Sequence, residues 1–185
     1  GARPTTGGTA ALAGAAAGQV GWAGEAEDGG ARVCLAHVGD RDERPSYYRG
    51  LDDAVRIGIQ EQRPGMIVQL CTGARGRTIE ERFSCLDLRP EMASFSTGSV
   101  NFPNGIYENP PDVVDDMARR RINIGLKPAI KTFDLASLSK ALDLFRQGLL
   151  TPPPQLQLVM AVQHARPTPD ALVRVIVARE AGLST

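Results

Sequence analysis

The sequence has no excess of charge of either sign and no long apolar run. Its 21 Lys and Arg residues balance 21 Asp and Glu residues, so we expect neither nucleic acid nor an anionic membrane surface as a partner. No apolar run approaches the roughly 20 residues that a bilayer-spanning helix needs. The first residues also lack the basic start and Leu-rich middle of a secretory signal.

Cysteine is scarce as well. Cys34, Cys71 and Cys85 form no Cys-x-x-Cys pair, and their odd number argues against a disulfide framework. These absences together favour a protein that works in a reducing, cytoplasmic compartment.

Residues 1–30 differ from the rest of the chain, because 18 of these 30 residues are Gly or Ala. Alanine favours helix, whereas each glycine inside a helix costs about 1 kcal/mol. We therefore expect a loose helix from Thr9 to Glu27 that lies on a surface, and we treat residues 1–30 as a segment distinct from a domain over 31–185.

From residue 31 the chain alternates between short apolar runs and amphipathic stretches. Five runs predict strands: Ala31–Val38, Met66–Leu70, Glu91–Ser96, Leu126–Phe133 and Gln155–Val162. Helices are predicted between and after them, with apolar faces formed by Leu51, Ala54, Val55 and Ile59, by Val113, Val114 and Met117, and by Leu135, Leu138, Leu142 and Phe145. Local signals mark the helix ends: Ser46 as a cap, Pro64 as a stop, Thr78 with Glu81 as a capping box, Asn109 as a cap before Pro110, Gly148 as a C-terminal cap, and Thr168 with Pro169 opening a last helix.

This alternation predicts an α/β fold with a parallel sheet. Periodicity alone leaves open whether the sheet is doubly wound or closed into a (β/α)₈ TIM barrel. A complete barrel takes about 250 residues, so a barrel in this chain would be incomplete, with about five to six βα units. Unpaired edges of such a sheet invite pairing with another chain, and we expect a homo-oligomer.

Polar residues follow the predicted strands, at the edge where parallel sheets hold their ligands. They are His37 with Asp40 and Arg41, Cys71 with Thr72 and Gly73, Ser94 with Ser96, Lys131 with Asp134, and Gln163 with His164. Each has a plainer interpretation: a hydrogen-bonded His37, a solvated His164, a small packed Cys71, or a salt bridge from Lys131 to Asp134 or Asp40. The run Arg119–Arg121 is typical of a solvated helix face.

Several segments together resemble the β-keto acid cleavage enzymes, typified by 3-keto-5-aminohexanoate cleavage enzyme. The resemblance covers about residues 31–175, and its most specific part is the central run from Leu88 to Phe102. The other matching segments are Ala36–Val38, Arg44–Ser46, Leu70–Gly73, Glu80–Arg82, Glu108–Pro110, Gly125–Pro128, Phe133–Asp134, Gly148–Leu150 and Gln157–Val159.

The resemblance implies a (β/α)₈ barrel, usually oligomeric, that binds a divalent metal, typically zinc. It implies exchange of an acyl group between a small-molecule β-keto acid and acetyl-CoA, which gives a new CoA ester and acetoacetate. In that chemistry the metal binds the keto oxygen and carboxylate of the substrate and stabilises the developing negative charge. Carried onto this chain, the resemblance implies catalytic roles for Thr72, Ser94 and Lys131, substrate-binding roles for Ser46, Cys71, Gly73 and Asn101, and His37 as a metal ligand.

The chain also departs from the family pattern. In the family's His-x-His-x-Arg motif, Leu35 stands at the first His and Gly39 at the Arg, and Ala129 and Lys131 replace the two acidic residues of Pro-Glu-x-Glu. The family's Arg-x-Gly-x-Glu-Asp motif has no counterpart in the sequence. Two hypotheses follow: a metal-dependent acyl-exchanging enzyme, or a degenerate relative that binds small molecules or acts as a scaffold without catalysis. An incomplete or imperfectly determined sequence would account for the same departures.

Overall fold

The computed structural model describes residues 12–38, 46, 48–73, 76–103, 105–159, 173 and 180. The chain divides into two compact units, residues 1–71 with 81–92 and residues 72–80 with 93–185. The last predicted helix, after Thr168, and the strand residues beyond Val159 lie outside the described residues. No helix of the described part is both long and apolar enough to cross a membrane.

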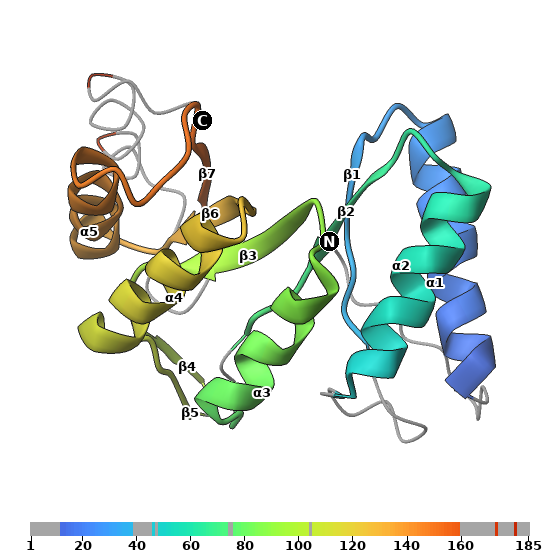
Figure 1. The fold of residues 1–185 in the computed structure, drawn as a ribbon, viewed down its shortest axis with the longest axis horizontal. Coiled ribbons are helices and arrows are strands. Elements are labelled where there is room, and N and C mark those ends of the chain that lie inside the picture. Colours follow the sequence, from blue (N-terminus) through green and yellow to red (C-terminus); the bar gives the residue numbers. More distant parts are fainter. Residues whose placement is uncertain are drawn as a thin grey trace. The chain divides into compact units, whose positions relative to one another are not determined.

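The first unit combines two long helices with a pair of parallel strands (Figure 1). Strands β1 (Val33–Leu35) and β2 (Ile67–Leu70) pair in parallel, with Leu35 beside Gln69. The other elements are α1 (Leu12–Asp28), α2 (Arg49–Gln62) and the short 3₁₀ turn η1 (Cys85–Leu88), while α3 (Ile79–Ser84) leads into that turn. The predicted apolar face of α2 is confirmed at Leu51, Val55 and Ile59, whereas Ala54 is exposed.

The helix predicted over Thr9–Glu27 is present as α1, and one of its faces packs closely on α2. Val20 and Ala23 are buried. A Cβ atom added at Gly58 of α2 would lie 2.8 Å from Cγ2 of Val20, so the absence of a side chain at Gly58 permits this approach. Glycine therefore has a packing role here that offsets its poor helix propensity.

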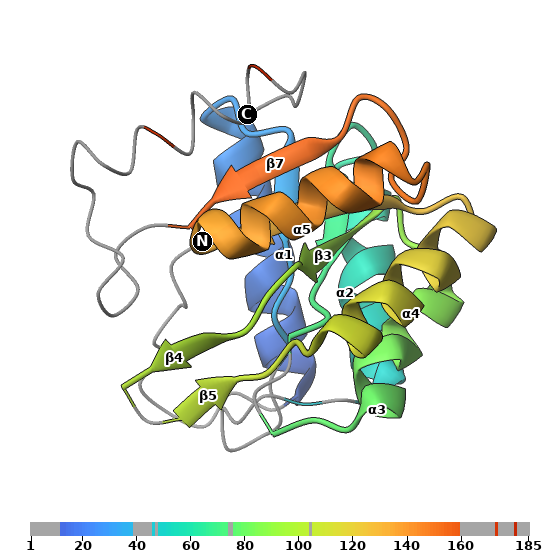
Figure 2. The same ribbon diagram turned by 90° about the vertical axis from the view of Figure 1, so that its left-hand side faces the viewer.

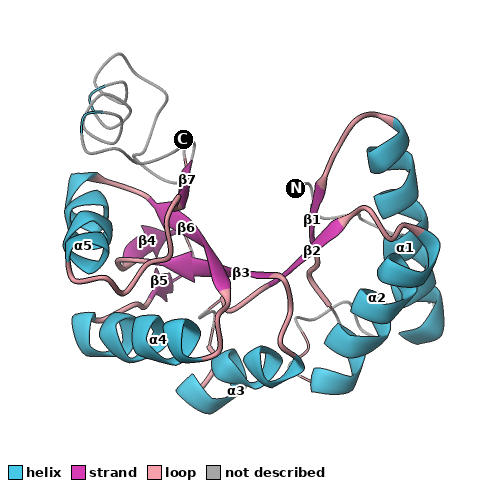
Figure 3. Cartoon of the chain, turned by 45° about the horizontal axis from the view of Figure 1, so that its top comes forward, coloured by secondary structure: helices cyan, strands magenta, loops and turns pink. Residues whose placement is uncertain are grey.

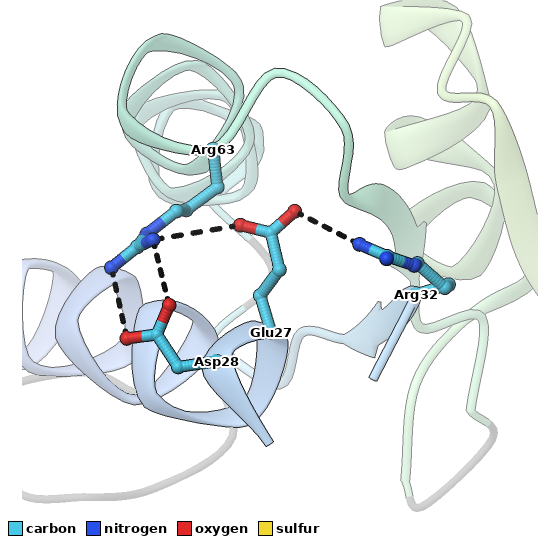
Figure 4. A network of polar contacts seen from close by, with 4 residues as sticks. All are labelled: Glu27, Asp28, Arg32 and Arg63. Carbon is cyan, nitrogen blue, oxygen red and sulfur yellow. Dashed lines mark hydrogen bonds and ion pairs between the residues drawn. The ribbon is translucent and has the colours of Figure 1, made fainter. Parts of the chain in front are cut away.

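Ion pairs hold the carboxyl end of α1 (Figure 4). Arg63, at the end of α2, lies 3.0 Å from Asp28 and 3.8 Å from Glu27. Arg32 reaches the other carboxylate oxygen of Glu27 at 3.7 Å. Because Asp28 is 66% exposed and Arg63 still 36% exposed, this network contributes little to stability and mainly fixes the orientation of the helix end.

The second unit contains the central strands of the fold. Strand β6 (Lys127–Thr132) lies between β3 (Met92–Ser96) and β7 (Gln155–Leu158), and β6 and β7 pair in parallel. Helices α4 (Pro111–Asn123) and α5 (Leu135–Arg146) connect these strands and lie alongside them (Figure 3). The predicted core residues Val113, Val114 and Met117 of α4 are buried, as are Leu138 and Leu142 of α5, but Leu135 is half exposed.

The polar stretch after β3 is not a simple loop. It contains an antiparallel hairpin of β4 (Val100–Phe102) and β5 (Gly105–Tyr107) (Figure 2). Asn109, predicted to cap α4, is instead buried, and its side-chain amide donates to the carbonyl oxygen of Gly98 at 3.1 Å. Helix α4 begins one residue later than predicted, with Pro110 at the cap position and Pro111 inside the first turn. The Asn109 side chain is used to close the hairpin rather than to cap the helix.

Two other helix ends can be compared with their predicted signals. Ser46 does not cap α2, whose cap residue is Tyr48; the Ser46 hydroxyl accepts a hydrogen bond from the Tyr48 amide at 3.2 Å. Gly148 follows the end of α5 with a φ of 72°, the left-handed conformation that glycine tolerates best. The predicted C-terminal cap is therefore confirmed.

Helix α5 starts with a complete capping box. The Asp134 carboxylate accepts from the Ser137 amide at 2.8 Å, and the Ser137 hydroxyl accepts from the amides of Phe133 and Asp134. We expect Ser137→Ala to lower the free energy of unfolding by about 2 kcal/mol, since buried amides lose their acceptor. Urea denaturation measures this, with Ser139→Ala on the exposed side of α5 as a control expected within about 0.5 kcal/mol of the wild type. Equal effects of the two substitutions would contradict the role given to Ser137.

Candidate functional site at the strand ends

Thr72 and Ser94, two predicted catalytic residues, are brought together in the second unit. Both are buried. The Thr72 amide donates to the Ser94 hydroxyl at 2.9 Å, and the Thr72 hydroxyl donates to the Ser94 carbonyl oxygen at 2.5 Å. The hydroxyl proton of Thr72 is thus engaged by backbone, and the pair fixes the geometry of the strand ends.

Arg121 of α4 completes this buried group. Its guanidinium donates to Thr72 Oγ1 at 3.1 Å and to the carbonyl oxygens of Ala93, at 2.9 Å, and Ser94. It also lies over the Phe95 ring, 5.1 Å from the ring centroid, where cation–π attraction adds to the hydrogen bonds. Arg121 therefore ties α4 to the end of β3.

The prediction of a solvated Arg119–Arg121 face is wrong at its last residue. Arg119 and Arg120 are exposed, but Arg121 is only 1% exposed. The reason is helical geometry: residue 121 lies three and four positions after Ala118 and Met117, which are buried on the core side of α4. Arg121 thus faces the core, although it belongs to a run of charged residues.

A second polar group forms on the opposite face of β3. Phe95 faces Arg121, so by strand alternation Ser94 and Ser96 face the other way. The Thr97 amide donates to the Lys131 carbonyl oxygen at 3.3 Å, which in a parallel ladder places Ser96 beside Lys131. The same pattern holds one strand further, where the Val159 amide donates to Thr132 and the register pairs Thr132 with Leu158.

The register also pairs Lys131 with Gln157 of β7. Ser96, Lys131 and Gln157 are therefore neighbours on one face at the carboxyl ends of three adjacent strands. Tyr107 of the hairpin joins them, with its hydroxyl 3.3 Å from the Ser96 hydroxyl. We call Ser96, Tyr107, Lys131 and Gln157 the strand-end cluster.

Aromatic contacts hold the Tyr107 side chain in the cluster. Its ring packs edge-on against Phe133, with 5.9 Å between centroids, and against Phe102 at 5.8 Å. Phe133 directly follows Thr132, the last residue of β6, so its contact with Tyr107 brings the hairpin to the end of that strand. The cluster thus offers an ammonium, two hydroxyls and an amide beside a small aromatic wall.

The remaining predicted site residues fall into different surroundings. His37, Ser46 and Cys71 belong to the first unit, where His37 is exposed and its carbonyl oxygen accepts from the Gln19 side chain at 2.9 Å. In the second unit Gly73 is buried and Asn101, on β4, is exposed. Asp40, Arg41, Gln163 and His164 lie outside the described residues.

Buried groups elsewhere add little reactive chemistry. Burial raises the pKa of the Cys34 thiol, which disfavours the thiolate that a nucleophile or metal ligand requires. The side-chain nitrogen of Gln69 and the hydroxyl of Thr132 are buried without a hydrogen-bond partner among the described residues. Neither atom belongs to the strand-end cluster.

The described residues do not fit the zinc site that the resemblance implies. A catalytic zinc takes three protein ligands, and within the described ranges no three His, Cys, Asp or Glu side chains come together to hold an ion. Two residues before His37 stands Leu35, which has no donor atom for a metal. Lys131 on β6 carries a positive charge that would repel a cation bound near it.

Three members of the site were not recognised as such from the sequence: Arg121, Tyr107 and Gln157. Tyr107 lies outside the five predicted strands, although Asn104-Gly105 between apolar residues is a hairpin signal that favours a strand there. Gln157 lies on the predicted fifth strand, but the sequence does not predict that it is paired with Lys131, which depends on the register of the two strands. No sequence signal separates Arg121 from its two exposed neighbours.

Comparison with solved structures identifies the fold. A complex of ObcA with oxaloacetate superposes with a TM-score of 0.70 at 24% sequence identity, covering 80% of this chain and 37% of that one. A mandelate racemase/muconate lactonizing protein from Herpetosiphon aurantiacus covers 93% of this chain with a TM-score of 0.54. The predicted (β/α) TIM-barrel type is confirmed, and the described strands make up part of such a barrel.

Comparison with sequences identifies the family. The chain is 39% identical over 140 residues to 3-oxoadipate:acetyl-CoA acetyltransferase of Cupriavidus necator, covering 76% of this chain and 49% of that protein. It is 33% identical over 154 residues to 3-keto-5-aminohexanoate cleavage enzyme of Acetoanaerobium sticklandii, covering 82% and 56%. The chain thus spans about half the length of the curated relatives it matches. A family model described as beta-keto acid cleavage enzyme matches residues 1–183, and the chain belongs to that family.

Proposed function

We propose that this protein exchanges an acyl group between a β-keto acid and acetyl-CoA. The observation that carries the proposal is the family match over residues 1–183, joined with a polar cluster at the carboxyl ends of the parallel strands. In the exchange, the bond between the keto carbon and the acetate unit of the β-keto acid breaks. The bond between the acetyl group and the sulfur of acetyl-CoA breaks as well. The freed acyl group then joins the CoA sulfur, and the acetate unit joins the acetyl group to give acetoacetate.

The chain's own residues supply binding and charge stabilisation in this proposal. The Lys131 ammonium attracts the substrate carboxylate. The Ser96 and Tyr107 hydroxyls are positioned as donors to an oxygen on which negative charge develops. Thr72 and Ser94 remain in the proposed site, where their mutual hydrogen bonds fix the strand ends.

The predicted roles of the other residues stay part of the proposal. Cys71 and Gly73 continue the chain at the end of β2, and Ser46 and Asn101 are kept as substrate-binding residues. His37 is kept as a ligand for the family's divalent metal, which would need partners beyond the described residues. Zinc as that metal, a cytoplasmic location and a homo-oligomeric state belong to the same proposal.

The test is an exchange assay with 3-oxoadipate, the substrate in the name of the Cupriavidus relative. The protein is incubated with this acid and acetyl-CoA, with and without added zinc, and acetoacetate is followed by NMR. We expect acetoacetate to form in proportion to the acetyl-CoA consumed. Ser96→Ala should lower the rate about tenfold or more by removing a donor, while Ser139→Ala, outside the cluster, should leave it unchanged. No acetoacetate above the protein-free blank in either condition would contradict the proposal.

A second candidate is a binding protein without turnover. Lys131 favours it, because a cation occupies the position where the family pattern has an acidic residue. This candidate predicts binding of the β-keto acid with no acetoacetate formed. The exchange assay and a binding measurement on the same sample separate the two.

A further inference from the structure

We infer that the strand-end cluster binds the carboxylate of a small β-keto acid directly through Lys131, without a divalent cation. The inference rests on the proposed function for the class of ligand, and it adds that Lys131 and its neighbours hold the acid without the help of a divalent cation. Nothing in the family resemblance assigns this task to a lysine, because the family pattern has an acidic residue at that position.

The first support is the position of Lys131. It lies on β6, between β3 and β7, at the carboxyl ends of parallel strands where ligands of this fold gather. The side chain is half-buried. A partly desolvated ammonium interacts more strongly with an anion than an exposed one does.

The second support is the chemistry of its neighbours. In the strand register, Lys131 has the hydroxyl of Ser96 on one neighbouring strand and the carboxamide of Gln157 on the other. The Tyr107 hydroxyl approaches the same Ser96 oxygen. A carboxylate has two oxygens with about four acceptor sites, so one ammonium together with neutral O–H and N–H donors is a suitable set.

The third support is the size of ligand that the aromatic contacts favour. Phe133 and Tyr107 pack edge to face, with 5.9 Å between their ring centroids, and the hydroxyl of Tyr107 brings this pair to Ser96. Their rings offer apolar contact to a short carbon chain while the carboxylate is held by the polar groups. The cluster therefore fits a small keto acid better than an inorganic anion.

The experiment is a calorimetric titration of the full chain with sodium acetoacetate in buffer containing EDTA. We expect saturable binding without metal. Lys131→Met should weaken it at least about tenfold, because a charge-assisted hydrogen bond is lost, and Lys131→Arg should restore part of it. The matched control is Lys127→Met, which removes an exposed lysine from the other end of the same strand and should leave binding unchanged.

Neutral and inorganic probes sharpen the result. Methyl acetoacetate, which lacks the carboxylate, should bind no more strongly to the wild type than to Lys131→Met. Chloride at matched ionic strength should compete only weakly. Thermal denaturation of each variant checks that folding is preserved, and if Lys131→Met fails to fold, Lys131→Gln and Tyr107→Phe provide the same comparison.

The outcomes separate this inference from the proposed function. Lys131-dependent binding without acetoacetate production supports the inference and removes the exchange activity. Exchange activity with acetoacetate binding that Lys131→Met leaves intact keeps the function and overturns the inference. No binding in EDTA, or binding only after zinc is added, also overturns it, because a metal would then hold the carboxylate.

Discussion

Replacing Arg121 with alanine should lower the free energy of unfolding by about 3–5 kcal/mol. The substitution removes hydrogen bonds to Thr72 and to the main-chain carbonyls of Ala93 and Ser94, together with a weaker one to the Met117 sulfur, and leaves a cavity beneath Phe95. The site is buried, so water cannot readily replace the guanidinium, and the Ser94 carbonyl keeps only its hydrogen bond from the Thr72 hydroxyl as a side-chain partner. Urea denaturation followed by circular dichroism measures the change.

Arg120→Ala is the matched control for this prediction. Arg120 is the preceding residue on α4, more than half exposed, and it pairs with Asp116 at 3.0 Å across one helical turn. A solvated pair of this kind contributes only about 0.3–0.5 kcal/mol. If both substitutions destabilised the protein equally, Arg121 would not hold the end of β3 as described.

Replacing Gly58 with leucine should destabilise the first unit by up to about 2 kcal/mol, because overpacking costs more than the gain in helix propensity returns. The new side chain would begin 2.8 Å from Cγ2 of Val20, which is buried and, being β-branched, has little freedom to rotate away. Overpacking of this kind typically costs 1–3 kcal/mol, and a bulky chain would also push α1 away from α2. The gain in helix propensity, about 1 kcal/mol, offsets only part of this cost.

Gly21→Ala gives a control of opposite sign. Gly21 lies on the exposed side of α1, and nothing approaches within 4 Å of an added Cβ atom. We expect this substitution to stabilise the helix by about 0.5–1 kcal/mol. Thermal denaturation compares the melting temperatures of both variants with that of the wild type. A melting temperature of Gly58→Leu no lower than that of Gly21→Ala would contradict close packing of α1 on α2 at Gly58.

The order of strands and helices could be predicted because each element has a local signal. The predicted strands Met66–Leu70, Glu91–Ser96 and Leu126–Phe133 contain β2, β3 and β6, and the faces of α2 and α4 follow the helical spacing of their apolar residues. Such patterns depend on neighbouring residues alone. Element boundaries moved by one or a few residues, as at Asn109, where a tertiary hydrogen bond outcompeted the local capping signal.

The site was predictable only in part, because its residues meet through the register of strands far apart in sequence. The sequence places Lys131 and Ser96 at strand ends, but only the hydrogen bond from the Thr97 amide to the Lys131 carbonyl shows that the two residues are neighbours. The hairpin that brings Tyr107 to Ser96 is not among the predicted elements. The run of three arginines predicts a solvated helix face for Arg121 as well, although Arg121 lies on a different face of α4 from Arg119 and Arg120.

Family membership and the residues of this chain point to the same region but not to the same electrostatics. The segments that resemble the family include Thr72 and Ser94, and Lys131 places a positive charge at the carboxyl end of β6. A positive charge there favours an anion over a cation as the ligand. We therefore expect the strand-end cluster to bind a carboxylate, whether the protein exchanges acyl groups or only binds its ligand.

The most direct test of that claim is a map of where acetoacetate binds. A ¹⁵N-labelled sample is titrated with sodium acetoacetate in EDTA, and amide chemical shifts are followed along the chain. The account predicts saturable shifts concentrated at residues 96–98, Tyr107, residues 131–133 and residues 157–159. Shifts concentrated in α1 and α2, or no saturable shift at any of these amides, would contradict it.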